Sequence, residues 1–210
     1  ATDRWRGTLV VVGQPAEETL VGAQAMLDDG LYDRVPRPDV VLAQHTAPLP
    51  AGMVAHPFGP AMAGSAAIEV VIHGRGGHAA TPHATIDPVL AAAATVLRLH
   101  TIVSRETAPA EQVVLTVGSV HAGSRDNVVP DRAELRLTVR GFSDAVLDRM
   151  IEAVRRVVRG ECAAAGCEKD PDVTVHARSP VTVNEPAAAA TVRGVHIGQF
   201  GVARVTDWPP

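Results

Sequence analysis

The clearest pattern of apolar and polar positions lies in the middle of the chain. Between residues 133 and 140 every second position is apolar, and charged residues or threonine fill the positions between them. This period of two predicts a strand with one face in a core and the other open. Similar runs predict three more strands, at residues 66–73, 112–120 and 173–177.

Two longer segments between these strands have helical periodicity. Residues 87–104 place Leu90, Ala94 and Leu97 on one apolar stripe, as on the buried side of an amphipathic helix. Residues 144–159 predict a second helix, which Ser143 is positioned to cap. The resulting order is βαββαβ, the ferredoxin-like split unit, with both helices on one face. We therefore predict an α+β domain over residues 63–179.

The flanking segments have a different pattern. Residues 8–12 and 39–43 are short apolar runs that predict buried strands, with a helix at residues 20–29 that stops at Gly30 and a loop at 32–38 between them. A helix at 185–200 and a short strand at 203–205 follow the middle domain. We predict that residues 1–62 and 180–210 are pieces of one incomplete α/β sheet domain, into which the α+β domain is inserted.

Composition excludes several classes of protein. With 46% hydrophobic and 20% charged residues, the chain can bury a sizeable core. Its sequence has no stretch near the roughly 20 apolar residues of a membrane span. The net charge of −4 and 3% aromatic content argue against nucleic acid as a partner.

The two cysteines, Cys162 and Cys167, are expected to be free thiols in a reducing compartment, and we expect a cytoplasmic protein. A zinc site is the alternative for this pair, but no second ligand pair has the spacing of a zinc finger.

The first candidate for chemistry is the carboxylate pair Glu17 and Glu18, at the end of the first predicted strand. Two adjacent carboxylates there are costly to desolvate unless a cation is present. One could hold a metal ion while the other serves as general base in a hydrolysis. The alternative is an acidic first turn of the following helix, where carboxylates complement the helix dipole.

Three more motifs follow along the chain. His45 comes just after the second predicted strand, where α/β sheets place their ligands. Residues 74–83 form a glycine-rich stretch around His78, and residues 126–131 contain Asn127 before Val-Val-Pro. In this order and spacing the motifs resemble the M20 family of metallopeptidases, and most closely its amidohydrolases of N-acyl amino acids, indole-acetyl amino acids and hippurate. The resemblance extends from residue 7 to about residue 207.

The resemblance implies roles for these residues. Glu17 would be the base that takes a proton from the attacking water, while Glu18 and His45 would be metal ligands. His78 would donate a hydrogen bond to the substrate carbonyl in the transition state, often in the site of a second subunit. Two divalent metal ions would be bound per site, and zinc, manganese, cobalt and nickel all suit mixed nitrogen and oxygen ligands.

The same resemblance implies a function for the inserted domain, which would act as a lid and as the contact of a homodimer. The family's upstream Cys-Gly-His-Asp-type motif and its downstream histidine ligand do not occur in these 210 residues. We therefore expect the chain to be the middle of a larger enzyme, to bind little metal alone and to be inactive alone.

Several alternatives stay open. His78 could lie on a flexible hairpin tip, and Asn127 could serve only the turn that Asp-Asn sequences favour. Arg140 could grip a substrate carboxylate from the open face of the sheet, or it could be a solvated strand residue. The other histidines have no predicted role and are most simply structural or solvent-facing: His56, His73, His83, His100, His121, His176 and His196.

A dinucleotide site at residues 74–79 is rejected, because Pro82 delays the helix that such a site needs. The functional alternatives to an amidohydrolase are a di- or aminopeptidase, a carbamoylase, and an inactive module that only self-associates.

Overall fold

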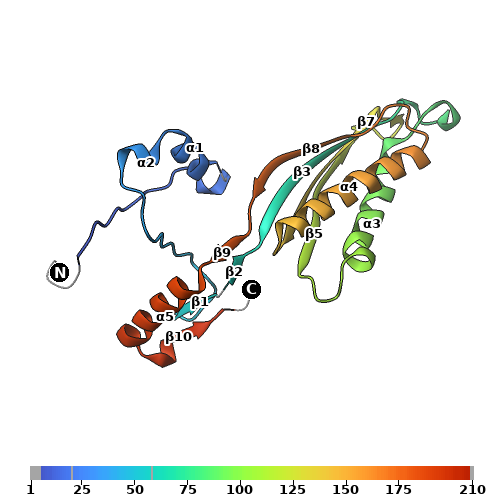
Figure 1. Cartoon of the computed structure of the whole chain (residues 1–210). Helices are drawn as coiled ribbons and strands as arrows, with labels where there is room; N and C mark the ends of the chain where they lie inside the picture. The colour runs from blue at the N-terminus through green and yellow to red at the C-terminus, as the bar shows by residue number, and fades with distance from the viewer. Residues whose placement is uncertain (1–5, 20, 58, 209–210) are drawn as a thin grey trace. The chain divides into compact units, whose positions relative to one another are not determined.

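The computed structural model describes residues 6–19, 21–57 and 59–208. The chain divides into two compact units, residues 1–49 and residues 50–210. Figure 1 shows the elements of both units, coloured along the chain. Among the described residues, every helix is too short or too polar to cross a membrane.

The described part of the first unit consists of short helices and extended segments. After the 3-10 turn η2 (Glu17–Thr19) come α1 (Gly22–Asp28) and α2 (Leu31–Arg34). Gly30 has a φ of +77° and lies between the two helices, which confirms the predicted helix stop. The loop predicted at residues 32–38 is wrong in its first half, because α2 continues to Arg34.

The two strands predicted in this unit do not form. Residues 8–12 and 39–43 have no regular secondary structure, and their apolar side chains are exposed, up to 86% for Val11 and 74% for Val41. A strand needs a neighbour for its backbone N–H and C=O groups. The described residues of this unit offer no such neighbour, so an apolar run alone is not sufficient.

The second unit is built on a four-stranded antiparallel sheet in the order β5-β7-β3-β8. All four predicted strands are confirmed, each a little longer than predicted. Their bounds are β3 (Gly64–His73), β5 (Val113–Ala122), β7 (Arg132–Gly141) and β8 (Asp172–Ser179). The alternation in β7 is as predicted, because Ala133, Leu135, Leu137 and Val139 are all buried.

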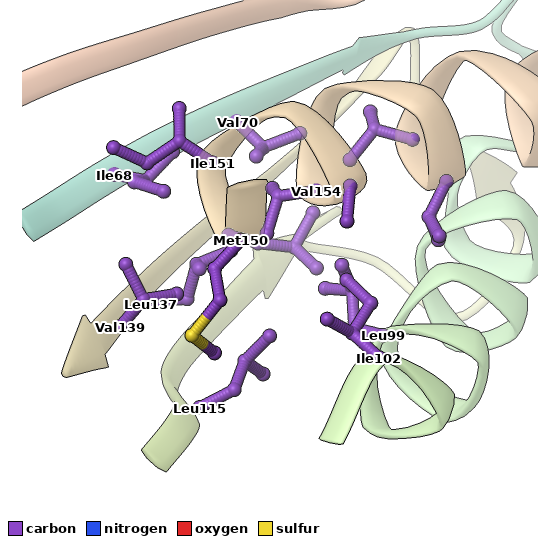
Figure 2. Close-up of a cluster of buried hydrophobic side chains, with 14 of the residues drawn as sticks. Ile68, Val70, Leu99, Ile102, Leu115, Leu137, Val139, Met150, Ile151 and Val154 are labelled. Atoms are coloured by element: carbon purple, nitrogen blue, oxygen red, sulfur yellow. The ribbon is translucent and has the colours of Figure 1, made fainter. Parts of the chain in front are cut away.

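Two long helices cover one face of this sheet. They are α3 (Pro88–Glu106), which begins at Asp87, and α4 (Asp144–Ala164). Asp87 caps α3 by accepting a hydrogen bond from the N–H of Val89 at 2.8 Å. Figure 2 shows the core between these helices and the sheet, where Leu99 of α3 and Val154 of α4 share one cluster with strand residues such as Leu137.

The predicted buried stripe of α3 is wrong. Leu90 is 69% exposed and Leu97 is 76% exposed, and Ala94 is exposed as well. The face that meets the sheet is carried by Ala91, Ala92, Thr95, Leu99 and Ile102. Because α3 is apolar on both sides, its periodicity did not decide which side is buried.

A small antiparallel ladder lies beside the large sheet. It pairs β4 (Gly77–His78) with β6 (Val128–Val129), and the 3-10 turn η3 (Pro82–Ala84) follows β4. This ladder was not predicted. Ser143 stands at the start of α4 as expected, but its side chain makes no capping hydrogen bond there.

The remaining elements come from both ends of the second unit. β1 (Val54–His56) pairs in parallel with β10 (Val205–Asp207), and β2 (Gly59–Met62) pairs with β9 (Thr182–Asn184). The helix α5 (Pro186–Phe200) is confirmed. The strand predicted at 203–205 is displaced, because η4 (Val202–Arg204) precedes β10.

Candidate functional site

Glu17 and Glu18 lie on a tight turn at the start of η2. Ala16 has a φ of +50°, an unusual conformation for a residue other than glycine. Thr19 closes the turn, because its N–H and its hydroxyl both donate to the carbonyl of Ala16, at 3.3 and 3.0 Å. A side chain at Gly22 would come within 1.5 Å of the carbonyl oxygen of Pro15, so this packing requires glycine. Both carboxylates are exposed on a backbone that is strained and fixed, a feature typical of functional sites.

His45 is exposed in the same unit, and its ring has a defined protonation pattern. Its Nδ1 lies 2.6 Å from the carbonyl oxygen of Thr46. A carbonyl only accepts, so Nδ1 carries the proton and, in the neutral ring, Nε2 keeps its lone pair. Histidines that ligate metals commonly donate their other ring N–H to a carbonyl in this way. The geometry of His45 therefore suits a metal ligand.

The donor set fits a divalent metal only in part. A carboxylate at Glu18 and an imidazole at His45 are ligand types that zinc and its neighbours prefer. Within the described ranges of the chain, however, no group of three or more histidine, cysteine, aspartate or glutamate side chains is placed to hold a metal ion.

In the second unit, His78 is the last residue of β4, and the segments on both sides of it are held in place. The N–H of Ala79 donates to the carbonyl of Asn127 at 3.1 Å, directly beside the β4–β6 ladder. Gly74 and Gly76 allow close approach, because a Cβ there would lie 2.4 Å from the oxygen of Ile86 and 2.9 Å from the oxygen of Val129. The glycine-rich stretch is therefore a packed turn and not a flexible hairpin tip.

The ring of His78 has the opposite protonation pattern to that of His45. The backbone N–H of Ala80 donates to Nδ1 of His78 at 3.1 Å. With Nδ1 accepting, the neutral ring carries its proton on Nε2, which is exposed. Nε2 can then donate a hydrogen bond outward, which is the chemistry that stabilises a developing oxyanion.

Asn127 and Arg140, the two residues predicted to bind substrate, lie at opposite ends of the sheet. Asn127 lies beside His78, at the end of the sheet where β7 begins with Arg132. Arg140 lies eight residues further along β7, opposite Ser65, and eight steps of a strand span about 27 Å. The structure therefore brings His78 and Asn127 together and places Arg140 away from both.

A cleft of about 800 Å³ borders the loop just before His78, along Gly76 and Gly77. Polar side chains line it, among them His121, Arg125 and Arg132. No motif predicted a role for these residues. The only signal in the sequence is the position of Arg125, two residues before Asn127.

Comparison with known proteins gives this geometry a family context. The family described as the peptidase dimerisation domain matches residues 61–165, from β2 to the end of α4. The chain belongs to the M20 peptidase family. This confirms the resemblance stated from the sequence motifs.

Named relatives agree with this membership. The chain is 38% identical over 182 residues to the IAA-amino acid hydrolase ILR1-like 2 of Arabidopsis thaliana, which covers 85% of this chain and 40% of the relative. It is 38% identical over 160 residues to the N-acetyldiaminopimelate deacetylase of Leuconostoc mesenteroides, covering 76% of this chain and 42% of that protein. The chain thus spans less than half the length of these relatives.

A solved structure has a similar fold. A dinuclear metal-binding peptidase of the M20 family from Bacillus subtilis superposes with a TM-score of 0.63 at 27% identity, covering 94% of this chain and 49% of that one.

Proposed function

We propose that the whole protein is a metal-dependent amidohydrolase that cleaves the amide bond of N-acyl amino acids. The observation that carries this proposal is the strained turn that presents Glu17 and Glu18. It is supported by relatives named as hydrolases of amino-acid conjugates and as deacetylases of N-acetyl compounds. We also propose that the protein works in the cytoplasm.

Glu18 and His45 would hold divalent metal together with further ligands, with two ions per site as in the dinuclear relative. Bound divalent ions supply positive charge that polarises a carbonyl and lowers the pKa of water. Glu17 would then take a proton from the attacking water and deliver it to the leaving amine. Zinc, manganese, cobalt and nickel all match this donor set.

His78 would donate from Nε2 to the carbonyl oxygen of the scissile amide. The position of His78 along the sheet indicates whether it can share a substrate with Arg140 of the same chain. β3 begins at Gly64, next to the β2–β9 ladder, and its nine steps to His73 span about 30 Å before the loop of His78 begins. An N-acyl amino acid is much shorter than this. His78 and Asn127 lie too far from Arg140 along the sheet to bind one such substrate together. They would therefore serve different sites, with His78 and Asn127 in the site of a second copy and Arg140 binding a substrate carboxylate elsewhere.

The unit at residues 63–179 would be the ferredoxin-like lid and the dimerisation domain, and residues 1–62 and 180–210 would belong to the catalytic domain. The sheet order β5-β7-β3-β8 with both helices on one face supports the first assignment. The match to the peptidase dimerisation domain supports a second copy as the partner.

The dimer contact would use the edge strand β5 and the outer face of α3. Large apolar side chains are exposed on these two elements: Val89, Leu90, Leu97, Val114 and Val120. At the other edge, α4 and β8 expose no large apolar side chain among the described residues. Charged pairs lie there instead, such as Arg178 with Asp148. Two copies related by a two-fold axis would cover both α3 stripes at once.

The test uses the whole protein with N-acetyl amino acids as substrates. Glu17→Gln should keep its metal and lose turnover by orders of magnitude, because an amide cannot accept the proton. Glu18→Ala should instead lower the metal content measured by elemental analysis. Near-normal turnover of Glu17→Gln would refute the assignment of the base. Activity on dipeptides or N-carbamoyl amino acids alone would favour the peptidase or the carbamoylase.

A further inference from the structure

Two histidines that lie far apart in the sequence meet beside the β1–β10 ladder. His56 is the last residue of β1 and His196 lies on α5. Nε2 of His56 is 2.9 Å from Nδ1 of His196, and the ring centroids are 5.0 Å apart. His56 is 9% exposed, which is unusual for a group that can become charged near neutral pH. His196 is half-buried, so the hydrogen bond between the two rings is partly withdrawn from water.

This hydrogen bond depends on the protonation state. One ring nitrogen must donate and the other must accept, so at most one of the two rings can be positively charged. If both rings were protonated, two N–H groups on cationic rings would face each other across the contact. The bond would then be replaced by repulsion in a poorly solvated place.

The surroundings of the pair oppose its protonation. Burial is the largest cause that lowers the pKa of His56, followed by the charges of His196 and Arg193 on α5, while Asp207 on β10 raises it. Arg193 forms an ion pair with Asp207 at 2.8 Å. The carboxylate of Asp207 is therefore less able to stabilise a positive charge on His56. Phe200 packs against His196, with ring centroids 5.5 Å apart.

The pair also lies at a junction of the chain. Asn184, the last residue of β9, donates from its side chain to the carbonyl of Pro57, next to His56, at 3.0 Å. β9 leads directly into α5, and the N–H of Trp208 donates to the carbonyl of His56 at 3.2 Å. A change at His56 therefore acts on α5, on β10 and on the β2–β9 ladder together.

We propose that His56 and His196 form a proton-sensitive clasp, which holds α5 against the β1–β10 ladder at neutral pH and releases it in mild acid. The sign follows from linkage. Because the folded chain lowers the pKa of His56, the unfolded chain takes up its proton first as the pH falls. Stabilisation by the clasp is complete above the ordinary histidine value of about 6.5 and is lost as the pH falls through the lowered pKa of His56.

The first test is a titration of the intact chain by NMR, from pH 8 to pH 5, that follows the ring nitrogens of the histidines. His56 should stay neutral at pH values just below about 6.5, where a histidine of the urea-unfolded chain already takes up its proton. His196→Gln should move the titration of His56 upward, toward that of the unfolded chain. If His56 titrates at the same pH in the folded and in the unfolded chain, the clasp does not exist.

The second test measures hydrogen exchange of backbone amides at pH 8 and pH 5.5, corrected for intrinsic exchange. Protection of residues 187–200 in α5 should fall at pH 5.5, while α4 in the same sample keeps its protection. The double variant His56→Gln/His196→Gln should show no such pH-dependent fall, and His100→Gln should behave like the unaltered chain. A fall of the same size in the double variant, or no fall in the unaltered chain, would overturn the proposal.

Discussion

Leu97 offers the sharpest test of the proposed dimer surface. This side chain is 76% exposed in the middle of α3, on a face about two turns long, with Val89 and Leu90, that the sheet does not cover. In the proposed dimer, each copy would bury its own Leu97 against the other. The substitution Leu97→Glu places a charge at the centre of that contact and leaves the core between α3 and the sheet unchanged.

The expected effect follows from the exposed area. Burying a leucine side chain completely stabilises by about 1.5–3 kcal/mol, so covering the exposed 76% of Leu97 is worth about 1–2 kcal/mol. Because a two-fold dimer buries one Leu97 from each copy, the total contribution is about 2–4 kcal/mol per dimer. Since each 1.4 kcal/mol is a factor of ten, the dissociation constant should rise about 30- to 700-fold.

Sedimentation velocity over a range of concentrations measures this change. The control is Ala145→Glu on the exposed side of α4, which adds the same charge away from the proposed contact and should leave the dissociation constant unchanged. Circular dichroism should show both variants folded. Equal weakening by the two variants, or a dimer untouched by Leu97→Glu, would refute the placement of the contact on α3.

Three further predictions concern single side chains. Thr95 is fully buried and its hydroxyl has no partner in the described chain, so Thr95→Val should raise the free energy of unfolding by about 1 kcal/mol in urea titrations, whereas Thr101→Val, which removes a bonded hydroxyl, should not. Burial raises the pKa of the Cys162 thiol to about 12, so iodoacetamide at pH 8 should label Cys167 and spare Cys162 until the chain unfolds. The neutral ring of His78 should carry its proton on Nε2 in nitrogen NMR spectra, and a proton on Nδ1 would contradict its role as an outward donor.

The sheet of the second unit was predictable because its signal is local. In β7 the alternation of four buried apolar residues with polar neighbours leaves one register, since a slip of one residue would expose the whole apolar set. The partners that bury this set lie within the same 120 residues. For α3 the pattern failed, because alanine and leucine occupy both sides of the helix and only packing selects one of them.

The candidate site was predictable to a smaller extent. The motifs marked Glu17, His45 and His78, but they gave no indication of which ring nitrogen each histidine would expose. That property comes from one backbone group in each case, the carbonyl of Thr46 and the N–H of Ala80. The pairing of His56 with His196 was missed for a different reason. The two residues are 140 positions apart, and neither lies in a motif.

The exposed apolar residues of the two units require different partners. On α3 every backbone group inside the helix is already bonded, so Leu90 and Leu97 need only an apolar surface, which a second copy of the same helix provides. Residues 8–12 and 39–43 have exposed apolar side chains and no strand beside them, so a surface alone would leave their backbone groups unpaired. Only neighbouring strands satisfy both needs. This is why we assign the first surface to the contact between two copies, whereas residues 8–12 and 39–43, which form no strand here, would need a strand beside each of them.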